Sequence, residues 1–159
     1  MSQNEKQLKV YVAGSFNNAD MCREAGGLIR DAGMHSYVFC DEGSEAYSHS
    51  INIRELNLIK RLTPSTALQN EYIQAIYKAN MKELMTSDVV VLILPCGKSA
   101  HMEAGWIKGA DGGKLIIYGQ MKQGEFDAMY GMADLVTDDF QEVLWLLTHL
   151  SNEKGAKVQ

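Results

Sequence analysis

The segment DVVVLILPCGKSAHMEAGW, residues 88–106, joins an apolar run to a polar loop and a helix-like stretch. After Asp88, the run at 88–94 is apolar at consecutive positions, as in a strand buried on both faces of a parallel sheet. Pro95 ends the run, and Glu103 follows in the first turns of the expected helix. A strand, a loop and a helix in this order predict an α/β domain with the loop at the carboxyl edge of its sheet.

Four other segments have the composition of strands. They are residues 9–14, 35–40, 114–119 and 134–137. Helix-like segments alternate with them, which predicts a parallel sheet with helices on both faces, a three-layer Rossmann-like sandwich. Five strands favour the flavodoxin-like order 2-1-3-4-5. In this order strands 1 and 3 are neighbours, so the loops at 14–18 and 95–99 are expected side by side, next to Glu103.

Helices are expected at residues 20–33, where Gly33 ends the helix, and at 140–150. The long connection at 41–64 contains a helix-like piece, and a second helix is expected from about residue 65 to 85. The first piece is a candidate lid or dimer contact, and extra packing explains it equally well.

The length of 159 residues suits one domain, expected at 1–150, with a polar tail at 151–159. No apolar run approaches the ~20 residues that a membrane helix needs, so no membrane is expected as a partner. The net charge of -5 and the lack of a Lys/Arg cluster disfavour binding of a nucleic acid polymer. A small anionic ligand remains compatible with this charge, because a loop and a helix N-terminus can hold one locally.

Three cysteines, Cys22, Cys40 and Cys96, lack the spacing of metal ligands and cannot all pair. Reduced thiols in a cytoplasmic protein fit this pattern best. The polar N-terminal sequence MSQNEKQLK is unlike a secretory signal, which also favours the cytoplasm.

Glu103 is the first candidate for chemistry, and two interpretations of it stay open. A carboxylate near a helix N-terminus is stabilised by the helix dipole and the unpaired N–H groups, so it can serve stability alone. A capping box does not account for it, because Ser99 as the N-cap would place the acid at Met102. The alternative is a working acid beside the predicted ligand cleft.

Asn80 is the second candidate, since it lies on the apolar stripe of its helix between Ile76 and Leu84. A buried amide needs hydrogen-bond partners, which are either nearby backbone groups or a ligand. In the loop before Glu103, Lys98 and its neighbours offer N–H groups, an ammonium and a hydroxyl, which suit an anion. Neither this loop nor the one after strand 1 matches a Walker or dinucleotide-binding motif.

Together these motifs resemble the nucleoside 2-deoxyribosyltransferase-like family, which includes the deoxyribonucleoside 5′-monophosphate N-glycosidases. The resemblance covers about residues 9–150. It rests on VYVAGSF at 10–16, SDVVVLILP at 87–95, MEAGWIKGADGGK at 102–114 and DAMYGMAD at 127–134. It implies an enzyme that breaks or exchanges the N-glycosidic bond of deoxynucleosides, and such chemistry needs no metal or redox cofactor.

The resemblance also assigns roles to individual residues. Glu103, followed by Ala104 and Gly105, falls on the family's nucleophile, and Tyr11 matches a tyrosine that contacts its carboxylate. Asn80, in the helix expected before strand 3, falls on a further catalytic position of the family. The residues then expected to bind substrate are Gly14, Ser15, Phe16, Asp88, Gly97, Lys98, Ser99, His101, Asp127 and Met129.

Two positions depart from the family pattern. Asn80 stands where the family has an aspartate that protonates the leaving base, and an amide cannot deliver a proton. Gly97 stands where the transferases have an aspartate that recognises the base. His101 is a candidate to replace the missing acid, with a bystander role as the alternative.

The segment at 127–134 resembles a loop that one subunit lends to its neighbour's site, which implies at least a homodimer, that is, a homodimer or a higher homo-oligomer. Asp127 would face the sugar 5′ position and repel a phosphate there, whereas Lys98 and Ser99 would attract one. The resemblance therefore leaves nucleoside and nucleotide substrates both open.

Three other functions remain compatible with the sequence. A TIR-type NAD glycohydrolase also uses a glutamate on a similar α/β fold. A nucleotide-binding protein without catalysis would explain the amide at Asn80. A structural Glu103 in a small α/β domain is the simplest alternative.

Overall fold

The computed structural model describes residues 7–121 and 126–157. Five parallel strands form one sheet in the order β2-β1-β3-β4-β5, so the predicted fold class and strand order are confirmed. The strands are β1 Lys9–Ala13, β2 His35–Val38, β3 Val89–Ile93, β4 Lys114–Tyr118 and β5 Leu135–Thr137.

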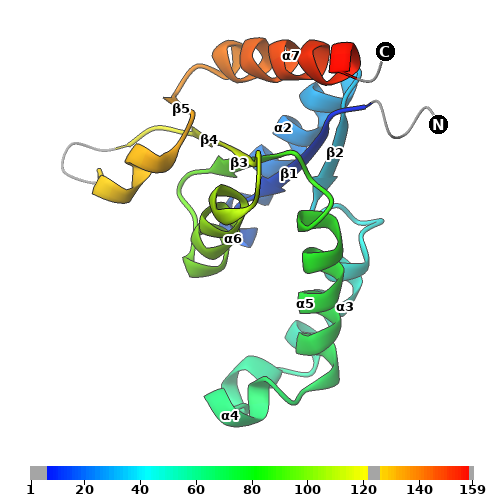
Figure 1. Ribbon diagram of the computed structural model, residues 1–159. Coiled ribbons are helices and arrows are strands. Elements are labelled where there is room, and N and C mark those ends of the chain that lie inside the picture. Colours follow the sequence, from blue (N-terminus) through cyan, green and yellow to red (C-terminus); the bar gives the residue numbers. More distant parts are fainter. Residues whose placement is uncertain (1–6, 122–125, 158–159) are drawn as a thin grey trace.

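Helices cover both faces of this sheet (Figure 1). On one face lie α2, Ala19–Asp31, and α7, Phe140–Lys157, and on the other lies α6, Lys98–Gly109. All five residues of β3 are buried, because alternate side chains enter the cores on opposite faces of the sheet. This explains why the run at 88–94 lacks the polar alternation of a half-exposed strand.

The same alternation in β1 places Tyr11 in the core on the α6 side. Val10 and Val12 point into the opposite core, while Tyr11 and Ala13 pack toward α6. Tyr11 is fully buried, with an exposed fraction of 0%. The pleat of β1 therefore places a phenolic hydroxyl beneath the helix that carries Glu103.

The connection between β2 and β3 folds into α3 Glu45–Glu55, a 3-10 turn Leu58–Lys60, α4 Pro64–Ala67 and α5 Glu71–Leu84. Figure 1 shows α3 and α5 side by side, with α4 at the end of the pair away from the sheet. The predicted single helix from 65 to 85 is wrong, because Asn70 starts a new helix. Its side chain accepts hydrogen bonds from the backbone N–H groups of Tyr72 and Ile73.

The C-terminal helix is longer than predicted. Residues 151–157 continue α7 rather than forming a loose tail, and 158–159 lie outside the described residues. Lys154 links the last turns of α7 to the start of the sheet, because its Nζ donates to Asp88 Oδ2 at 2.7 Å and to the Gln7 carbonyl at 3.1 Å. Within the described ranges, no helix combines the length and the apolar character that crossing a membrane requires.

Candidate functional site

Glu103 lies on α6 and reaches down to β1. The Tyr11 hydroxyl donates a hydrogen bond of 2.8 Å to Glu103 Oε1. The N-cap of α6 is Gly97 rather than Ser99, so Glu103 is the sixth residue of the helix, counting from Lys98. The helix dipole is felt mainly within the first turn, so dipole stabilisation is a weak explanation for a carboxylate at this position.

Burial gives Glu103 an unusual proton affinity. Loss of hydration raises the pKa of its carboxyl group from 4.5 to about 7, and the hydrogen bond from Tyr11 opposes part of this rise. The pKa of Tyr11 is raised well above its usual range, first by burial and then by the nearby Glu103 charge. Tyr11 is therefore a neutral hydrogen-bond donor, while Glu103 changes protonation state near neutral pH.

A cavity of about 270 Å³ lies in front of Glu103. It brings together the loop after β1, the loop after β3 and one wall formed by α3 and α5. Eight of the residues singled out from the sequence line it, namely Gly14, Ser15, Phe16, Asn80, Gly97, Lys98, Ser99 and Glu103. Its position beyond the carboxyl ends of β1 and β3 is where doubly wound α/β folds bind ligands.

A direct hydrogen bond joins the two loops as the strand order predicts. Asn18 Nδ2 donates to the Pro95 carbonyl at 3.1 Å, which ties the turn after β1 to the end of β3. The Ser15 hydroxyl accepts from the Asn17 N–H at 3.2 Å and shapes the same turn. This contact holds together two loops from segments 77 residues apart in the chain.

Gly14 lines the cavity, and the thiol of Cys22 leaves no room for a side chain at this position. A Cβ atom at this position would lie 2.4 Å from Cys22 Sγ, which is fully buried. Gly14→Ala is therefore expected to lower the free energy of unfolding by about 1–3 kcal/mol. Gly27→Ala in α2, where nothing lies within 4 Å of the added atom, should instead be neutral or stabilising by up to about 1 kcal/mol.

Urea denaturation of the two alanine variants beside the wild type measures this difference. Equal stability of Gly14→Ala and the wild type would contradict the close approach of the Cys22 thiol to Gly14.

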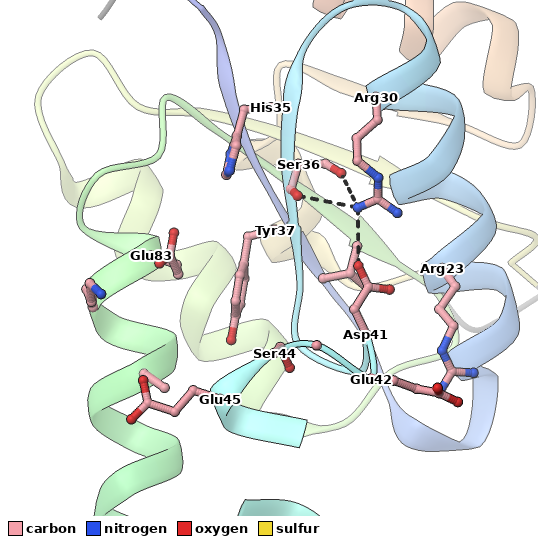
Figure 2. A pocket seen from close by; sticks show the side chains of 14 residues that line it. Arg23, Arg30, His35, Ser36, Tyr37, Asp41, Glu42, Ser44, Glu45 and Glu83 are labelled. Atoms are coloured by element: carbon pink, nitrogen blue, oxygen red, sulfur yellow. Dashed lines mark hydrogen bonds and ion pairs between the residues drawn. The ribbon is translucent and has the colours of Figure 1, made fainter. Parts of the chain in front are cut away.

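Tyr37, which the sequence did not single out, holds the amide of Asn80. Its hydroxyl donates to Asn80 Oδ1 at 2.8 Å, and its ring packs on Tyr11 with centroids 5.2 Å apart. Figure 2 shows Tyr37 extending from β2 toward Ser44, with Glu83 of α5 to one side. Since Oδ1 accepts from Tyr37, the two donor hydrogens of Nδ2 are the groups of Asn80 that suit an acceptor on a ligand in the cavity.

His101, Asp127 and Met129 line a second cavity of about 610 Å³, which shares only Gly97 and Lys98 with the first. The structure therefore separates these three residues from Glu103 within one subunit. Asp127 Oδ1 accepts from the Met129 N–H at 2.8 Å and caps the 3-10 helix η3, Ala128–Met132.

His101 has contacts at both ring nitrogens. Nδ1 lies 2.9 Å from the Gly97 carbonyl, and Nε2 lies 3.1 Å from the Tyr130 hydroxyl. A carbonyl only accepts, so the neutral ring carries its proton on Nδ1 and accepts from Tyr130 at Nε2. This arrangement does not direct a His101 proton toward the cavity of Glu103.

Asp88 lies at the opposite end of β3 from Glu103. Its Oδ2 accepts from the Lys9 N–H at 2.8 Å and from Lys154 Nζ at 2.7 Å. Binding of one substrate by Asp88 and Glu103 together does not fit this placement. Asp88 instead joins the start of β1 to the end of α7.

A third cavity, of about 730 Å³, lies at the open edge of β2 and excludes Glu103 (Figure 2). In it, Arg30 Nη1 lies 2.9 Å from Ser36 Oγ and 3.2 Å from Asp41 Oδ2. This cavity does not include the half-buried carboxyl group, held by a tyrosine hydroxyl, that distinguishes the site at Glu103.

Five further residues line the Glu103 cavity without having been predicted, namely Phe39, Ala46, Ser50, Ile76 and Ala100. Ile76 was visible as part of the apolar stripe that includes Asn80. The other four carry no signal of their own, and Ala46 and Ser50 reach the cavity because α3 packs on α5. Arg54 of α3 also approaches, with its guanidinium carbon 4.3 Å from the centre of the Phe16 ring.

Among the residues that the structure describes, no group of three His, Cys, Asp or Glu side chains is placed to hold a metal ion. No protein-family model matches the chain, and no curated protein matches it.

Proposed function

We propose that the protein cleaves or transfers the N-glycosidic bond of a (deoxy)nucleoside or its 5′-monophosphate, with Glu103 as the nucleophile. The observation that carries this proposal is a half-buried carboxyl group, held by the Tyr11 hydroxyl, at a cavity beyond the carboxyl ends of β1 and β3. The resemblance of the motifs to the nucleoside 2-deoxyribosyltransferase-like family supports the same chemistry.

The geometry supports a two-step reaction. Tyr11 holds Oε1, so Oε2 of the ionised Glu103 attacks the anomeric carbon while the bond to the base breaks. The resulting glycosyl ester is then attacked by water or by an acceptor base, which regenerates the Glu103 carboxylate. Two displacements at the same carbon retain its configuration.

The placement of charges favours a 5′-monophosphate over the bare nucleoside. Lys98 and Ser99 line the cavity of Glu103 and offer an ammonium and a hydroxyl, whereas Asp127 lies in the second cavity. Repulsion between Asp127 and a phosphate would arise only where a second copy lends its segment 127–134 to this cavity. Arg54 above Phe16 adds a second cation near this cavity.

A homodimer is part of the same proposal. Met102 of α6 and Met129 of η3 are exposed, with exposed fractions of 76% and 61%, although both are apolar. Burial of such side chains favours association with a second copy, through which the segment at 127–134 could complete the neighbour's site. Light scattering during size-exclusion chromatography distinguishes a dimer from a monomer.

An HPLC screen for released base tests the proposed reaction. The wild type is incubated with deoxynucleosides, their 5′-monophosphates, ribonucleotides and NAD, each with and without a free acceptor base. Release from nucleosides or nucleotides supports the proposal, and an acceptor-dependent product identifies transfer. Release from NAD alone points to a TIR-type NAD glycohydrolase, and thermal shifts without any release point to a nucleotide-binding protein.

A further inference from the structure

We propose that the leaving group of this reaction is a heterocycle bonded through a ring nitrogen that already carries a positive charge. A pyridinium ring and an N7-alkylated purine are the two common sources of this chemistry. The inference rests on the proposed function and specifies the substrate class of the same site.

The first observation is the shortage of acids in the cavity. Among the described residues that line it, only Glu103 and Lys98 carry ionisable side chains. Cleavage of a neutral glycoside normally uses two carboxyl groups, one as nucleophile and one as the acid that protonates the leaving group. Here Glu103 serves as the nucleophile, and the other polar side chain reaching in from α5 is the amide of Asn80.

The proposed function assigns the Lys98 ammonium to the 5′-phosphate, and the protons of Tyr11 and His101 are held elsewhere. The Tyr11 hydroxyl is committed to Glu103 Oε1, and the pKa of this hydroxyl lies far above neutral pH. His101 lines the second cavity, where the Gly97 carbonyl and the Tyr130 hydroxyl occupy its two nitrogens. None of these groups is therefore placed to protonate a base that must gain a proton in order to leave.

The second observation is the orientation of the Asn80 amide. Tyr37 donates to Oδ1, so the Nδ2 group is left to donate a hydrogen bond into the cavity. A carbonyl oxygen on the leaving ring, such as a carboxamide or a purine O6, is a suitable acceptor. This hydrogen bond orients the leaving group without transferring a proton to it.

A cationic leaving group removes the need for an acid. The anomeric C–N bond breaks with its electron pair moving to nitrogen, which neutralises the ring, while the bond from Glu103 Oε2 to the anomeric carbon forms. Water then hydrolyses the ester, giving the free sugar, the Glu103 carboxylate and one proton released to solvent. Hydrolysis of a neutral nucleoside releases no net proton when the free base stays neutral.

Two matched pairs of 5′-monophosphates test this inference. One pair is nicotinamide mononucleotide and its neutral 1,4-dihydro form, and the other is 7-methylguanosine and guanosine monophosphate. Base release is measured by HPLC, and proton release by a pH indicator in weak buffer. We expect at least one cationic partner to be cleaved about 10²-fold faster in kcat/KM than its neutral counterpart, with one proton released per turnover.

Because cationic glycosides are also intrinsically more reactive, the variant Asn80→Asp provides the decisive comparison. A carboxyl group here would keep the hydrogen bond from Tyr37, and the nearby Glu103 charge would favour its protonated form. We expect Asn80→Asp to cleave the neutral partners at least about tenfold faster than the wild type. The ratio of kcat/KM between cationic and neutral substrates should therefore be smaller in this variant. Asn80→Ala is the matched control and should show no such gain.

The outcomes separate this inference from the proposed function. Equal cleavage of neutral and cationic partners by the wild type overturns the inference and leaves Glu103 chemistry standing. A selective wild type with no gain in Asn80→Asp also overturns it, because the selectivity would then have another cause. No release from any substrate, despite ligand-induced thermal shifts, contradicts the proposed function itself.

Discussion

Glu103→Gln is expected to lower kcat/KM for base release by at least about 10³-fold, because an amide cannot form the glycosyl ester. The replacement keeps the size of the side chain, and its amide oxygen can still accept from the Tyr11 hydroxyl. Initial rates by HPLC on the best substrate of the wild type measure the loss. Glu24→Gln, at an exposed position of α2, is the matched control and should retain the wild-type rate.

Stability distinguishes lost chemistry from lost folding in the same variant. The raised pKa of Glu103 means that ionisation of its carboxyl group opposes folding. The favourable contribution of this group to the free energy of unfolding is therefore full below pH 4.5 and is lost as pH rises through about 7. Allowing for its partial exposure, Glu103→Gln should be about 1–2 kcal/mol more stable than the wild type at pH 8. At pH 4 the two proteins should unfold alike. A folded variant that keeps the wild-type rate would eliminate Glu103 as the nucleophile.

The rate of the wild type is expected to rise with pH and to level off above a midpoint near 7, the pKa of Glu103. Only the ionised carboxylate attacks, so kcat/KM should fall about tenfold per pH unit well below the midpoint, and about 50-fold between pH 7 and 5. A profile of kcat/KM from pH 5 to 9, with folding checked at each pH, measures this.

Tyr11→Phe assigns the midpoint to Glu103. The hydrogen bond from Tyr11 lowers the pKa of Glu103, so its removal should move the midpoint upward. Tyr77→Phe, which removes a largely exposed hydroxyl on α5, should leave the midpoint in place. A midpoint near 4.5, or a rate that falls as pH rises, would contradict a desolvated Glu103 acting as a nucleophile.

The sequence predicted the sheet well because periodicity reports burial directly. The unbroken apolar run around β3 indicates burial on both faces, and Gly33 ends α2 with a φ of 84°, which favours glycine. Right-handed crossovers then leave few arrangements for five parallel strands. The expected strand order places the loops after β1 and β3 next to each other. Glu103 could be placed beside those loops for the same reason.

The insertion between β2 and β3 was harder to predict. The break before α5 depends on a single cap at Asn70, and the cavity wall depends on how α3 packs on α5. Such packing is set by side chains that are distant in sequence, which periodicity within one segment does not report. The role of Tyr37 could not be predicted for the same reason, because its partner Asn80 lies 43 residues away in the chain.

The sequence by itself determined the fold class, the strand order and the acid at the carboxyl edge of the sheet, since local periodicity and chain connectivity encode these features. Only the tertiary structure decided which candidates share one cavity. It separated Asp88, His101 and Asp127 from Glu103, buried that carboxyl group against Tyr11, and oriented the Asn80 amide. Hydrogen bonds and desolvation act between groups that meet in space, so these properties appear only when the distant segments are packed together.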